Sequence, residues 1–427
     1  MDIDLSHLKE PCVCGKKHDF AVREIYIESG AVKRLGDILQ EFQNPAFICD
    51  SNTRAAAEPF LEEEFKDYPV IELNPQGLRA DNVSVEKVLK QLDFCDRGCS
   101  AVPVDILVAI GTGTIHELTR YCAAEYGIPF VSVPTAASGD SFATAVAAIT
   151  WDGMKKTFPA VAPEWILADT DIFSKAPYRL TAAGISDLMG TYTALIDWKV
   201  ANLLTGEYIC PEICNLQEEM IKNTERELDD IRDRDTESME KLMYALILSG
   251  LHMQMAGTSR PISGAAHHVA HLLDMETADY DQTLLHGEKV LAGLMLVLKE
   301  YKKLEESIRA GKAKVQNETM KGLEYGLLEK EFGTGSLFEE VIAENTPNPL
   351  EDIDLELLEE SLDQIGELID ELPEPEHLMK KLKKAGCLSA LPKLNIDEER
   401  KREIFYLSPY VRRTLTLLRL MKLIEIK

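Results

Sequence analysis

The fold is decided by one stretch of the chain, Asp105-Ile106-Leu107-Val108-Ala109-Ile110-Gly111-Thr112-Gly113-Thr114. After the initial aspartate, its apolar and mainly branched side chains are typical of a buried strand. The glycines that follow permit a tight turn, and the residues from Ile115 to Tyr126 have the spacing of a helix. A strand that passes through a glycine turn into a helix predicts one step of a parallel α/β sheet.

The same alternation continues on both sides of this stretch. Short apolar strands are expected at 22–27, 46–49, 70–73, 129–133 and 165–168, with a helix at 31–42. Because the strands are interleaved with helices, right-handed crossovers and a parallel sheet are expected. From Thr170 onward nearly everything reads as helical, including Leu180 to Leu204 and a final amphipathic helix at Tyr410 to Leu418.

Two domains are therefore predicted. Residues 1–173 are expected to form a Rossmann-like α/β domain that binds a dinucleotide. Residues 174–427 are expected to form an all-α domain that binds metal and substrate. The active site is expected in the cleft between them, and 427 residues are enough for two substantial cores.

Composition excludes several classes of partner. The chain has 73 acidic and 46 basic residues, and its formal charge of −27 argues against binding nucleic acid or an anionic membrane surface. No apolar run approaches 18 residues, and Met1-Asp2-Ile3-Asp4 does not resemble a signal peptide, so a cytoplasmic protein without membrane insertion is expected. The nine cysteines, an odd number without a secretory signal, make a disulfide framework improbable.

Histidines are crowded between residues 252 and 286. This segment contains five of the nine histidines, namely His252, His267, His268, His271 and His286. His267 and His271 are four residues apart, so they project from the same helical face and make half of a metal site, whereas His268 points elsewhere. His286 and Asp187, a carboxylate within an apolar helix, are candidates for the remaining ligands. The alternatives are a histidine-rich surface helix and an aspartate on a polar helix edge.

The glycine turn at Gly111 to Thr114 has a possible chemical role. Glycines let the backbone approach a pyrophosphate, and the following helix N-terminus offers unsatisfied N–H groups. Glu117 stands where the full dinucleotide fingerprint would have its third glycine, so an ordinary tight turn is the alternative. Asp50, at the end of an earlier strand, could bind ribose hydroxyls or could be a turn residue.

Three further segments contain candidate ligand residues. The loop of small and hydroxyl residues from Pro134 to Thr144 can pass close to a ligand. Lys156 follows an expected hairpin at Asp152-Gly153 and could bind phosphate, although such lysines are usually solvated. The run Cys12-Val13-Cys14-Gly15, with His18 close behind, suggests a small metal clip, but three ligand-type residues are weak evidence for a tetrahedral site.

Several of these motifs occur together in one order. They are Gly111-Thr112-Gly113-Thr114, Val133 to Asp140, Lys155-Lys156-Thr157, Ala183-Gly184-Ile185-Ser186-Asp187, Ser259-Arg260-Pro261, His267-x3-His271 and Leu285-His286-Gly287. From about residue 20 to the end, the chain resembles the bacterial sn-glycerol-1-phosphate dehydrogenases. That family lies in the superfamily of glycerol dehydrogenase, iron-containing alcohol dehydrogenases and 3-dehydroquinate synthase. This chain departs from the family's usual pattern at two positions. It has Ala266 where relatives have an acidic residue, and Gly139 where they have a bulkier residue.

The resemblance implies a set of site residues. Asp187, His267 and His286 would bind one divalent ion, which could be zinc, nickel or iron. His271 would contact the substrate and pass a proton, Asp140 would bind a substrate hydroxyl, and Arg260 or Lys156 would neutralise a phosphate. NAD or NADP would contact Asp50, Gly111, Gly113, Thr114, Ile115, His116, Glu117, Thr135, Ala136, Ala137, Ser138 and Thr144.

The function implied is the reversible reduction of dihydroxyacetone phosphate at C2 to sn-glycerol 1-phosphate. Asp50 favours NAD, because a carboxylate repels a 2′-phosphate, without excluding NADP. One alternative is a dehydrogenase for glycerol or another unphosphorylated polyol on the same scaffold. A more distant alternative is a non-catalytic nucleotide-binding protein. A homodimer or larger homo-oligomer is expected by resemblance.

Overall fold

The computed structural model describes residues 5, 8, 10–98, 103–275, 283–389, 394 and 396–426. The chain forms two compact units, each assembled from several segments. The first unit comprises Met1–Trp151, Lys156–Leu188 and Lys222–Gly257, and the second comprises Asp152–Lys155, Met189–Ile221 and Thr258–Lys427. Helix α6 (Tyr178–Thr205) begins in the first unit and continues without interruption into the second.

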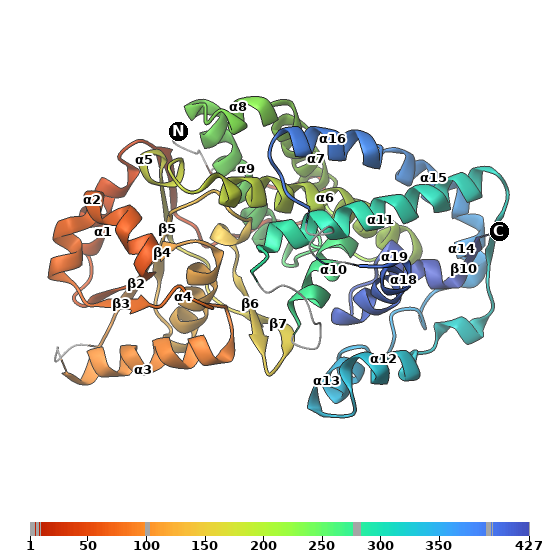
Figure 1. Ribbon diagram of the computed structural model, residues 1–427, viewed down its shortest axis with the longest axis horizontal. Helices are drawn as coiled ribbons and strands as arrows, with labels where there is room; N and C mark the ends of the chain where they lie inside the picture. Colours follow the sequence, from red (N-terminus) through yellow and green to blue (C-terminus); the bar gives the residue numbers. More distant parts are fainter. Residues whose placement is uncertain are drawn as a thin grey trace. The chain divides into compact units, whose positions relative to one another are not determined.

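The first unit contains a six-stranded parallel sheet with the strand order β1-β8-β5-β4-β2-β3 (Figure 1). Its strands are β1 (Glu24–Glu28), β2 (Pro45–Asp50), β3 (Val70–Leu73), β4 (Ile106–Gly111), β5 (Phe130–Pro134) and β8 (Trp165–Asp169). Every neighbouring pair in the sheet is parallel. The parallel, Rossmann-like sheet predicted from the alternating pattern is therefore confirmed.

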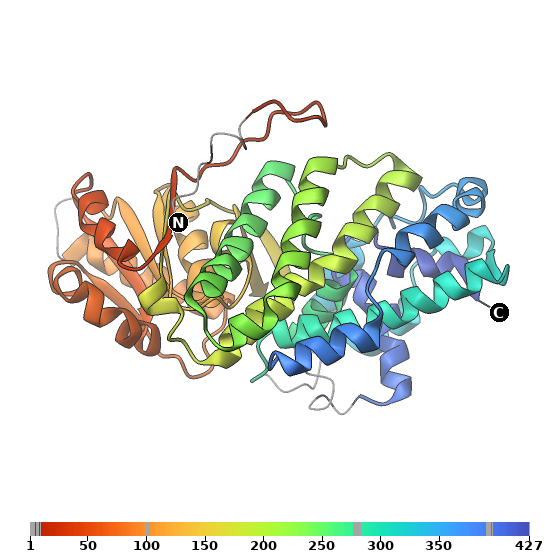
Figure 2. The same cartoon turned by 90° about the horizontal axis from the view of Figure 1, so that it is seen from above.

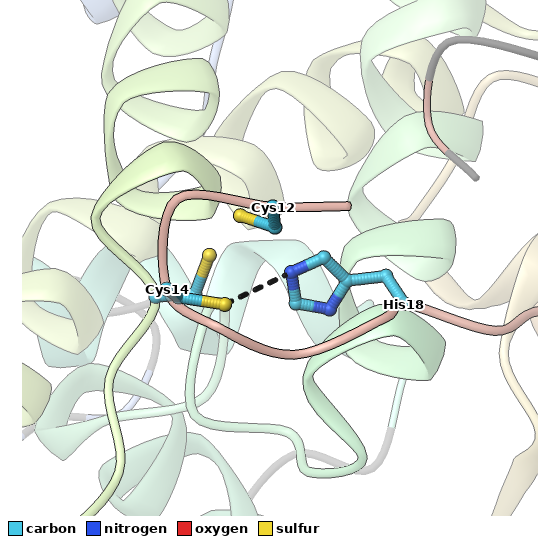
Figure 3. Close-up of side chains that lie close together, drawn as sticks. Cys12, Cys14 and His18 are labelled. Atoms are coloured by element: carbon cyan, nitrogen blue, oxygen red, sulfur yellow. Dashed lines mark hydrogen bonds between the residues drawn. The ribbon is translucent and has the colours of Figure 1, made fainter. Parts of the chain in front are cut away.

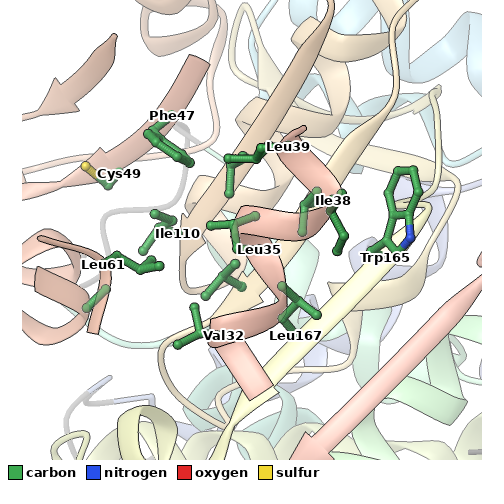
Figure 4. Close-up of a cluster of buried hydrophobic side chains, with 14 of the residues drawn as sticks. Val32, Leu35, Ile38, Leu39, Phe47, Cys49, Leu61, Ile110, Trp165 and Leu167 are labelled. Atoms are coloured by element: carbon green, nitrogen blue, oxygen red, sulfur yellow. The ribbon is translucent and has the colours of Figure 1, made fainter. Parts of the chain in front are cut away.

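Helices cover both faces of this sheet. One face packs against η2 (Ala31–Arg34), α1 (Leu35–Leu39) and α2 (Ser51–Asp67), and the other packs against α3 (Asn82–Gly98) and α4 (Gly113–Tyr126). Figure 4 shows part of the first core, where helix residues such as Leu35 meet strand residues such as Ile110. Because side chains alternate along a strand, Val108 joins this core whereas Leu107 joins the opposite one. Burial on both faces explains why the strands are apolar throughout.

The strand order reverses direction between β2 and β4. From β2 the chain continues outward to β3, whereas from β4 it continues the other way to β5 and then β8. The register that pairs Ile48 with Ala109 brings Asp50 and Gly111, the last residues of these strands, to the same level. Ligands of open α/β sheets bind outside the carboxyl ends of the strands at such a point. The first unit therefore places Asp50 and the glycine turn at the expected ligand edge.

The first unit contains further elements that are not part of this sheet. They include η3 (Ser141–Ala143), α5 (Thr170–Phe173), α8 (Leu228–Arg232) and α9 (Thr236–Ala256). Strands β6 (Val146–Trp151) and β7 (Met154–Pro159) form a separate two-stranded sheet, and the positive φ angles of Asp152 and Gly153 confirm the predicted hairpin turn. Residues 10–23, coloured red in Figure 2, form a loop that precedes β1.

The second unit is mainly helical, as predicted for the C-terminal part of the chain. Its helices include α7 (Pro211–Arg226, which ends in the first unit), α10 (Ala265–Asp274), α11 (His286–Arg309), α12 (Tyr325–Phe332), α13 (Ser336–Glu344), α14 (Leu355–Glu360), α15 (Leu362–Asp370), α16 (Pro375–Lys384), α18 (Glu398–Leu407) and α19 (Leu417–Leu420). Short 3-10 turns lie at η4 (Glu318–Lys321), η5 (Ser408–Val411) and η6 (Met421–Leu423). A small antiparallel sheet of β9 (Ala313–Val315) and β10 (Ile424–Ile426) was not expected. Among the described residues, no helix is both long enough and apolar enough to span a membrane.

The final amphipathic helix predicted at Tyr410 to Leu418 is wrong. The turn η5 ends at Val411, Arg412 is extended with φ −146° and ψ 147°, and the next helix begins only at Leu417. The buried guanidinium of Arg419 donates hydrogen bonds to the carbonyl oxygens of Pro409 and Arg412. Since these carbonyls bind a side chain rather than helical N–H groups, the segment stays open.

Candidate active site: a histidine cluster and a nucleotide edge

Three histidine rings lie together in the second unit. His267 and His271 belong to α10, and His286 is the first residue of α11. The ring centroids are 6.4 Å apart for His267 and His271, 6.0 Å for His267 and His286, and 5.7 Å for His271 and His286. The two helices can approach closely because Gly293 of α11 faces the carbonyl oxygen of Ala266, where an added Cβ would lie only 2.4 Å away.

Helix α6 provides the space that the ring of His267 occupies. A Cβ added at Gly190 would lie 2.8 Å from Cε1 of His267 and 2.4 Å from Cγ1 of Val290, so a larger residue could not remain there without movement. Asp187 precedes Gly190 by three residues on this continuous helix and therefore lies on the same helical face. Its side chain is 2% exposed, and its Oδ2 accepts a hydrogen bond of 3.2 Å from the backbone N–H of Asp140.

These residues have the composition of a metal-binding set. Asp187, His267 and His286 each offer one atom of a metal-ligating type, and the two histidines, both in the second unit, have ring centroids 6.0 Å apart. Two imidazoles and one carboxylate suit zinc, nickel or iron, and three protein ligands leave coordination positions open for a substrate. The donor set, together with the space at Gly190, fits one divalent ion.

Asp274, which was not predicted from the sequence, supports His286. Its Oδ2 lies 3.4 Å from Nδ1 of His286, and its Oδ1 pairs with the ammonium of Lys289. Burial opposes ionisation of Asp274, but the hydrogen bond from His286 and the charges of Lys289 and Lys155 hold its pKa well below the ordinary value. A carboxylate that binds the second nitrogen of a metal-ligating histidine orients the ring. The only sequence signal was an acidic residue one turn after His271.

His271 is neutral in this environment. Burial, followed by the nearby charges of Arg412, His286 and Lys155, lowers its pKa well below the ordinary value. Within the described part of the chain, its Nδ1 is buried and has no hydrogen-bond partner. A neutral imidazole can accept or donate a proton, so the ring has the form that acid–base chemistry requires.

Arg412 and Lys155 form a basic environment that sequence reasoning missed. Arg412 follows η5, which packs against α10, and its Nη1 donates a hydrogen bond to the backbone oxygen of Lys155. Its Nη2 is buried and has no hydrogen-bond partner among the described residues. Burial lowers the pKa of Arg412 to about 10, so the group remains charged at neutral pH. A buried guanidinium with an uncommitted nitrogen is suited to an anionic ligand.

The phosphate role predicted for Arg260 is not supported by its contacts. Arg260 is 4% exposed, and its Nε donates to Oε1 of Glu207 at 2.6 Å. Nη2 donates to the other carboxylate oxygen of Glu207, and Nη1 donates to the backbone oxygen of Leu415. The guanidinium is therefore committed to structure within the second unit. The other predicted phosphate residue, Lys156, is half-buried on β7.

In the first unit, the glycine turn has the geometry expected of a phosphate cradle. A Cβ added at Gly111 would lie 2.5 Å from Cβ of Ile115, so the close approach of strand and helix requires glycine. The N-cap residue Thr112 makes no side-chain hydrogen bond to the first turn of α4. Next to it, the N–H of Thr135 donates to the oxygen of Gly111 at 2.9 Å, which holds the Thr135 to Ser138 loop beside the turn. An anion could bind the N–H groups at this helix N-terminus.

Some predicted cofactor residues instead point into the core of the first unit. The Nδ1 of His116 bonds to the carbonyl oxygen of Thr112 at 2.9 Å, its Nε2 bonds to the hydroxyl of Ser132 at 2.8 Å, and burial lowers its pKa to about 3. Glu117 accepts hydrogen bonds from Arg120 and from the backbone N–H of Ala148. These contacts favour a structural role for both side chains. The same holds for Ile115, Ala136 and Ala137, which are fully buried, and for Thr144, whose hydroxyl donates to the oxygen of Val146.

Two predicted aspartates have structural contacts that do not decide their roles. Asp50 caps α2, because its Oδ1 accepts hydrogen bonds from the N–H groups of Asn52 and Thr53 at 2.8 and 3.1 Å. Asp140 precedes η3 and holds Asp187 through its backbone N–H. Ribose binding by Asp50 and substrate binding by Asp140 stay predictions.

Comparison with known proteins agrees with this architecture. A family model described as iron-containing alcohol dehydrogenase matches residues 26–177. An archaeal halo-thermophilic alcohol dehydrogenase from a Red Sea brine pool has a TM-score of 0.61 and 17% identity, with 93% of each chain covered. The fold is thus that of the iron-containing alcohol dehydrogenases.

Two curated relatives define the family more closely. The glycerol-1-phosphate dehydrogenase, NAD(P)+, of Bacillus licheniformis is 35% identical over 313 residues, which cover 69% of this chain and 74% of the relative. The enzyme of the same name from Geobacillus stearothermophilus is 30% identical over 403 residues, which cover 92% and 90%. The chain belongs to the glycerol-1-phosphate dehydrogenase family, and the resemblance inferred from its motifs is confirmed.

Proposed function

We propose that this protein is an NAD(P)-dependent, divalent-metal-dependent sn-glycerol-1-phosphate dehydrogenase. It reduces dihydroxyacetone phosphate reversibly at C2, and its relatives from Bacillus licheniformis and Geobacillus stearothermophilus are named for glycerol 1-phosphate. In the reducing direction, NAD(P)H gives a hydride to C2 and a proton reaches the C2 oxygen, so the products are NAD(P)+ and sn-glycerol 1-phosphate. The proposal includes a cytoplasmic location and a homodimer or larger homo-oligomer.

The assignment of a phosphorylated substrate rests on the basic environment of His271. Arg412 presents a buried Nη2 without a hydrogen-bond partner in the described structure, and both Arg412 and Lys155 lower the pKa of His271. A buried positive group is costly unless an anion pairs with it. A phosphate dianion on the substrate would provide the missing partner, whereas an uncharged polyol would not.

Asp187, His267 and His286 are the proposed ligands of the ion, which when bound supplies Lewis-acid polarisation of the C2 oxygen. Asp274 holds the ring of His286 through Nδ1, and Asp140 holds Asp187 through its backbone N–H. The neutral ring of His271 is the proposed route by which a proton reaches or leaves the substrate oxygen. In this proposal Asp140 also binds a substrate hydroxyl through its side chain.

The nicotinamide dinucleotide is proposed to bind at the carboxyl edge of the parallel sheet. Gly111 and Gly113 allow its pyrophosphate to approach the N-terminus of α4. Asp50 stands at the strand-order reversal, where a carboxylate commonly binds ribose hydroxyls and disfavours a 2′-phosphate. This arrangement supports a preference for NAD without excluding NADP.

The test is the oxidation of NADH and NADPH by metal-reconstituted protein, with dihydroxyacetone phosphate and free dihydroxyacetone supplied in parallel. We expect strong preference for the phosphate ester and a product of sn-1 configuration. His267→Ala should lose turnover and the ion that Asp187, His267 and His286 are proposed to bind. His268→Gln is the matched control, because His268 is the adjacent buried histidine but is not part of the ring cluster. Full metal content and normal turnover in His267→Ala would contradict the ligand assignment.

The second candidate is a dehydrogenase for an unphosphorylated polyol on the same scaffold. Its support is the commitment of Arg260 to Glu207, which removes one predicted phosphate group. Higher kcat/KM with free dihydroxyacetone than with its phosphate ester would select this candidate. Equal rates with both would show that Arg412 does not recognise phosphate.

A further inference from the structure

The loop before β1 brings together three side chains that the proposed dehydrogenase reaction does not use. Figure 3 shows Cys12, Cys14 and His18 turned toward one another, with Sγ of Cys14 at 3.4 Å from Nε2 of His18. One ligand atom from each of the three residues lies within 4.8 Å of the other two. All three belong to the first unit, so their geometry is internal to that unit. Two thiols and one imidazole are donors that zinc prefers.

The backbone of the loop forms a tight turn that places the two thiols. The N–H of Gly15 donates to the carbonyl oxygen of Cys12 at 3.0 Å. Gly15 has a φ of +81°, a conformation that glycine adopts at little cost. Val13 is 83% exposed, whereas Cys12 and Cys14 on either side of it are half-buried. The two thiols therefore lie on the side of the turn opposite Val13, where both can contact one ion.

His18 is held in the tautomer that a metal ligand needs. Its side chain is buried, and its Nδ1 lies 2.7 Å from the backbone oxygen of Met255, in the last turn of α9. A carbonyl oxygen only accepts hydrogen bonds, so Nδ1 carries the proton and Nε2 has a lone pair. The last carbonyls of a helix have no partner within it, so this hydrogen bond also satisfies the helix end. Fixing one ring nitrogen by a backbone carbonyl is a common way to orient a histidine toward a metal.

A second hydrogen bond holds the loop against α9. The N–H of Ala21 donates to Oε1 of Gln254 at 3.0 Å, and Nε2 of Gln254 donates to the backbone oxygen of Ala143. Together with the bond from His18 to Met255, this contact fixes the loop to two adjacent residues of α9. His18 is therefore positioned before any ion binds, which lowers the entropic cost of binding.

The distance between Cys14 and His18 agrees with a shared ion. Zinc binds thiolate sulfur at about 2.3 Å and histidine nitrogen at about 2.0–2.1 Å, so a tetrahedral angle separates these two atoms by about 3.6 Å. The observed separation between Sγ and Nε2 is 3.4 Å. Because Nε2 has the lone pair, the thiol of Cys14 donates its proton along this line. An ion can replace that proton with little movement of either side chain.

We propose that Cys12, Cys14 and His18 bind one zinc-type divalent ion, as a structural site separate from the histidine cluster of the second unit. On binding, both thiols lose their protons and His18 stays neutral, so the ion and these three ligands carry no net charge. The three residues fill three positions of a tetrahedral ion, and the fourth is open to a further donor such as water. The ion links the two cysteines to a histidine anchored on α9, so its role is to fasten the loop within the first unit.

The experiment uses full-length His267→Ala protein reconstituted with cobalt(II) under reducing conditions. Thiolate bound to cobalt gives a near-ultraviolet charge-transfer band, which carboxylate and imidazole ligands cannot give. We expect one metal equivalent per chain with this band. Replacing both Cys12 and Cys14 with Ala should remove the band and that equivalent, and His18→Ala should lower the affinity for cobalt. Cys122→Ala is the matched control and should keep both, because burial raises the pKa of this thiol of the same unit to about 12 and keeps it neutral.

A measurement on the unsubstituted protein covers the case in which these variants do not fold. A thiol-modifying mercurial should release one zinc equivalent per chain, and trypsin should then cleave faster after the exposed Lys16 and Lys17. Release of no zinc, or His267→Ala protein without the thiolate band, would overturn the proposal. An unchanged band after replacement of Cys12 and Cys14 would overturn the ligand assignment, and unchanged cleavage after zinc release would overturn the fastening role. None of these outcomes depends on turnover, so failure here is distinguishable from failure of the proposed dehydrogenase activity.

Discussion

Replacing Arg412 with Met is expected to weaken binding of the phosphorylated substrate without lowering the stability of the folded protein. Burial lowers the pKa of Arg412 to about 10, and each pH unit of displacement corresponds to about 1.4 kcal/mol. The buried charge therefore costs the folded protein about 3 kcal/mol. Against this, the variant loses the hydrogen bonds from Nη1 to the carbonyl oxygens of Lys155 and Val411, each contributing about 1 kcal/mol. The free energy of unfolding should rise by about 1 kcal/mol or stay the same.

Binding of the phosphorylated substrate should change far more. A hydrogen bond from a charged donor to phosphate contributes about 1.5–3 kcal/mol, which corresponds to a rise in KM for dihydroxyacetone phosphate of about 10- to 150-fold. The KM for NADH should be unchanged, because the nucleotide edge lies on the other unit. Urea unfolding gives the stability, and initial rates with each substrate varied give the two KM values.

Arg260→Met is the matched control for this prediction. It removes a guanidinium that is already paired with Glu207, so we expect a loss of about 2–4 kcal/mol of stability and little change in KM for the phosphate ester. The reasoning would be refuted if Arg412→Met unfolded more easily while its KM stayed normal. It would also be refuted if Arg260→Met were the variant with the raised KM.

Two further predictions follow from other contacts. Asp274→Asn removes the carboxylate that orients His286, so metal affinity should fall about 10- to 100-fold in equilibrium dialysis, and unchanged affinity would exclude the supporting role. His116→Gln should alter the acid dependence of stability. The folded-state pKa of His116 is about 3, below its unfolded value of 6.5, so the unfolded state binds a proton that the folded state excludes. Stability therefore falls as pH decreases from about 6.5 toward 3, by about 1.4 kcal/mol per pH unit for this group, and the variant should lose that part of the slope in urea titrations. The same slope in both proteins would show that His116 titrates normally.

Much of the first unit could be predicted because its signals are local. The strand that ends at Gly111 is apolar on both faces, and the glycines after it belong to the same short segment. The pairing of His267 with His271 is also local, since residues four apart share a helical face. Asp187 and His286 could be named only as candidates for the remaining ligands, which the family resemblance then supported, because these two residues lie on other helices.

Sequence patterns were less informative where a distant segment supplies the partner of a side chain. Arg260 has the charge to bind phosphate, but its Nε and Nη2 both donate hydrogen bonds to the carboxylate of Glu207. His116 and Glu117 lie in the first turns of α4, next to the glycine turn that suggests cofactor binding, yet their side chains bind Ser132 and Arg120 inside the core. The periodicity at Tyr410 to Leu418 is that of a helix, but the carbonyl oxygens of Pro409 and Arg412 accept hydrogen bonds from the side chain of Arg419.

By itself, the sequence determined the parallel α/β sheet, the glycine turn at its edge, the helical C-terminal region and the histidine pair. These depend on periodicity, backbone freedom and spacing, which act over a few residues. Only the tertiary structure decided that Asp274 supports His286, and that Arg412 rather than Arg260 offers a guanidinium nitrogen without a partner among the described residues. The physical reason is that ion pairing, desolvation and metal coordination depend on distances between segments, and a sequence does not state those distances.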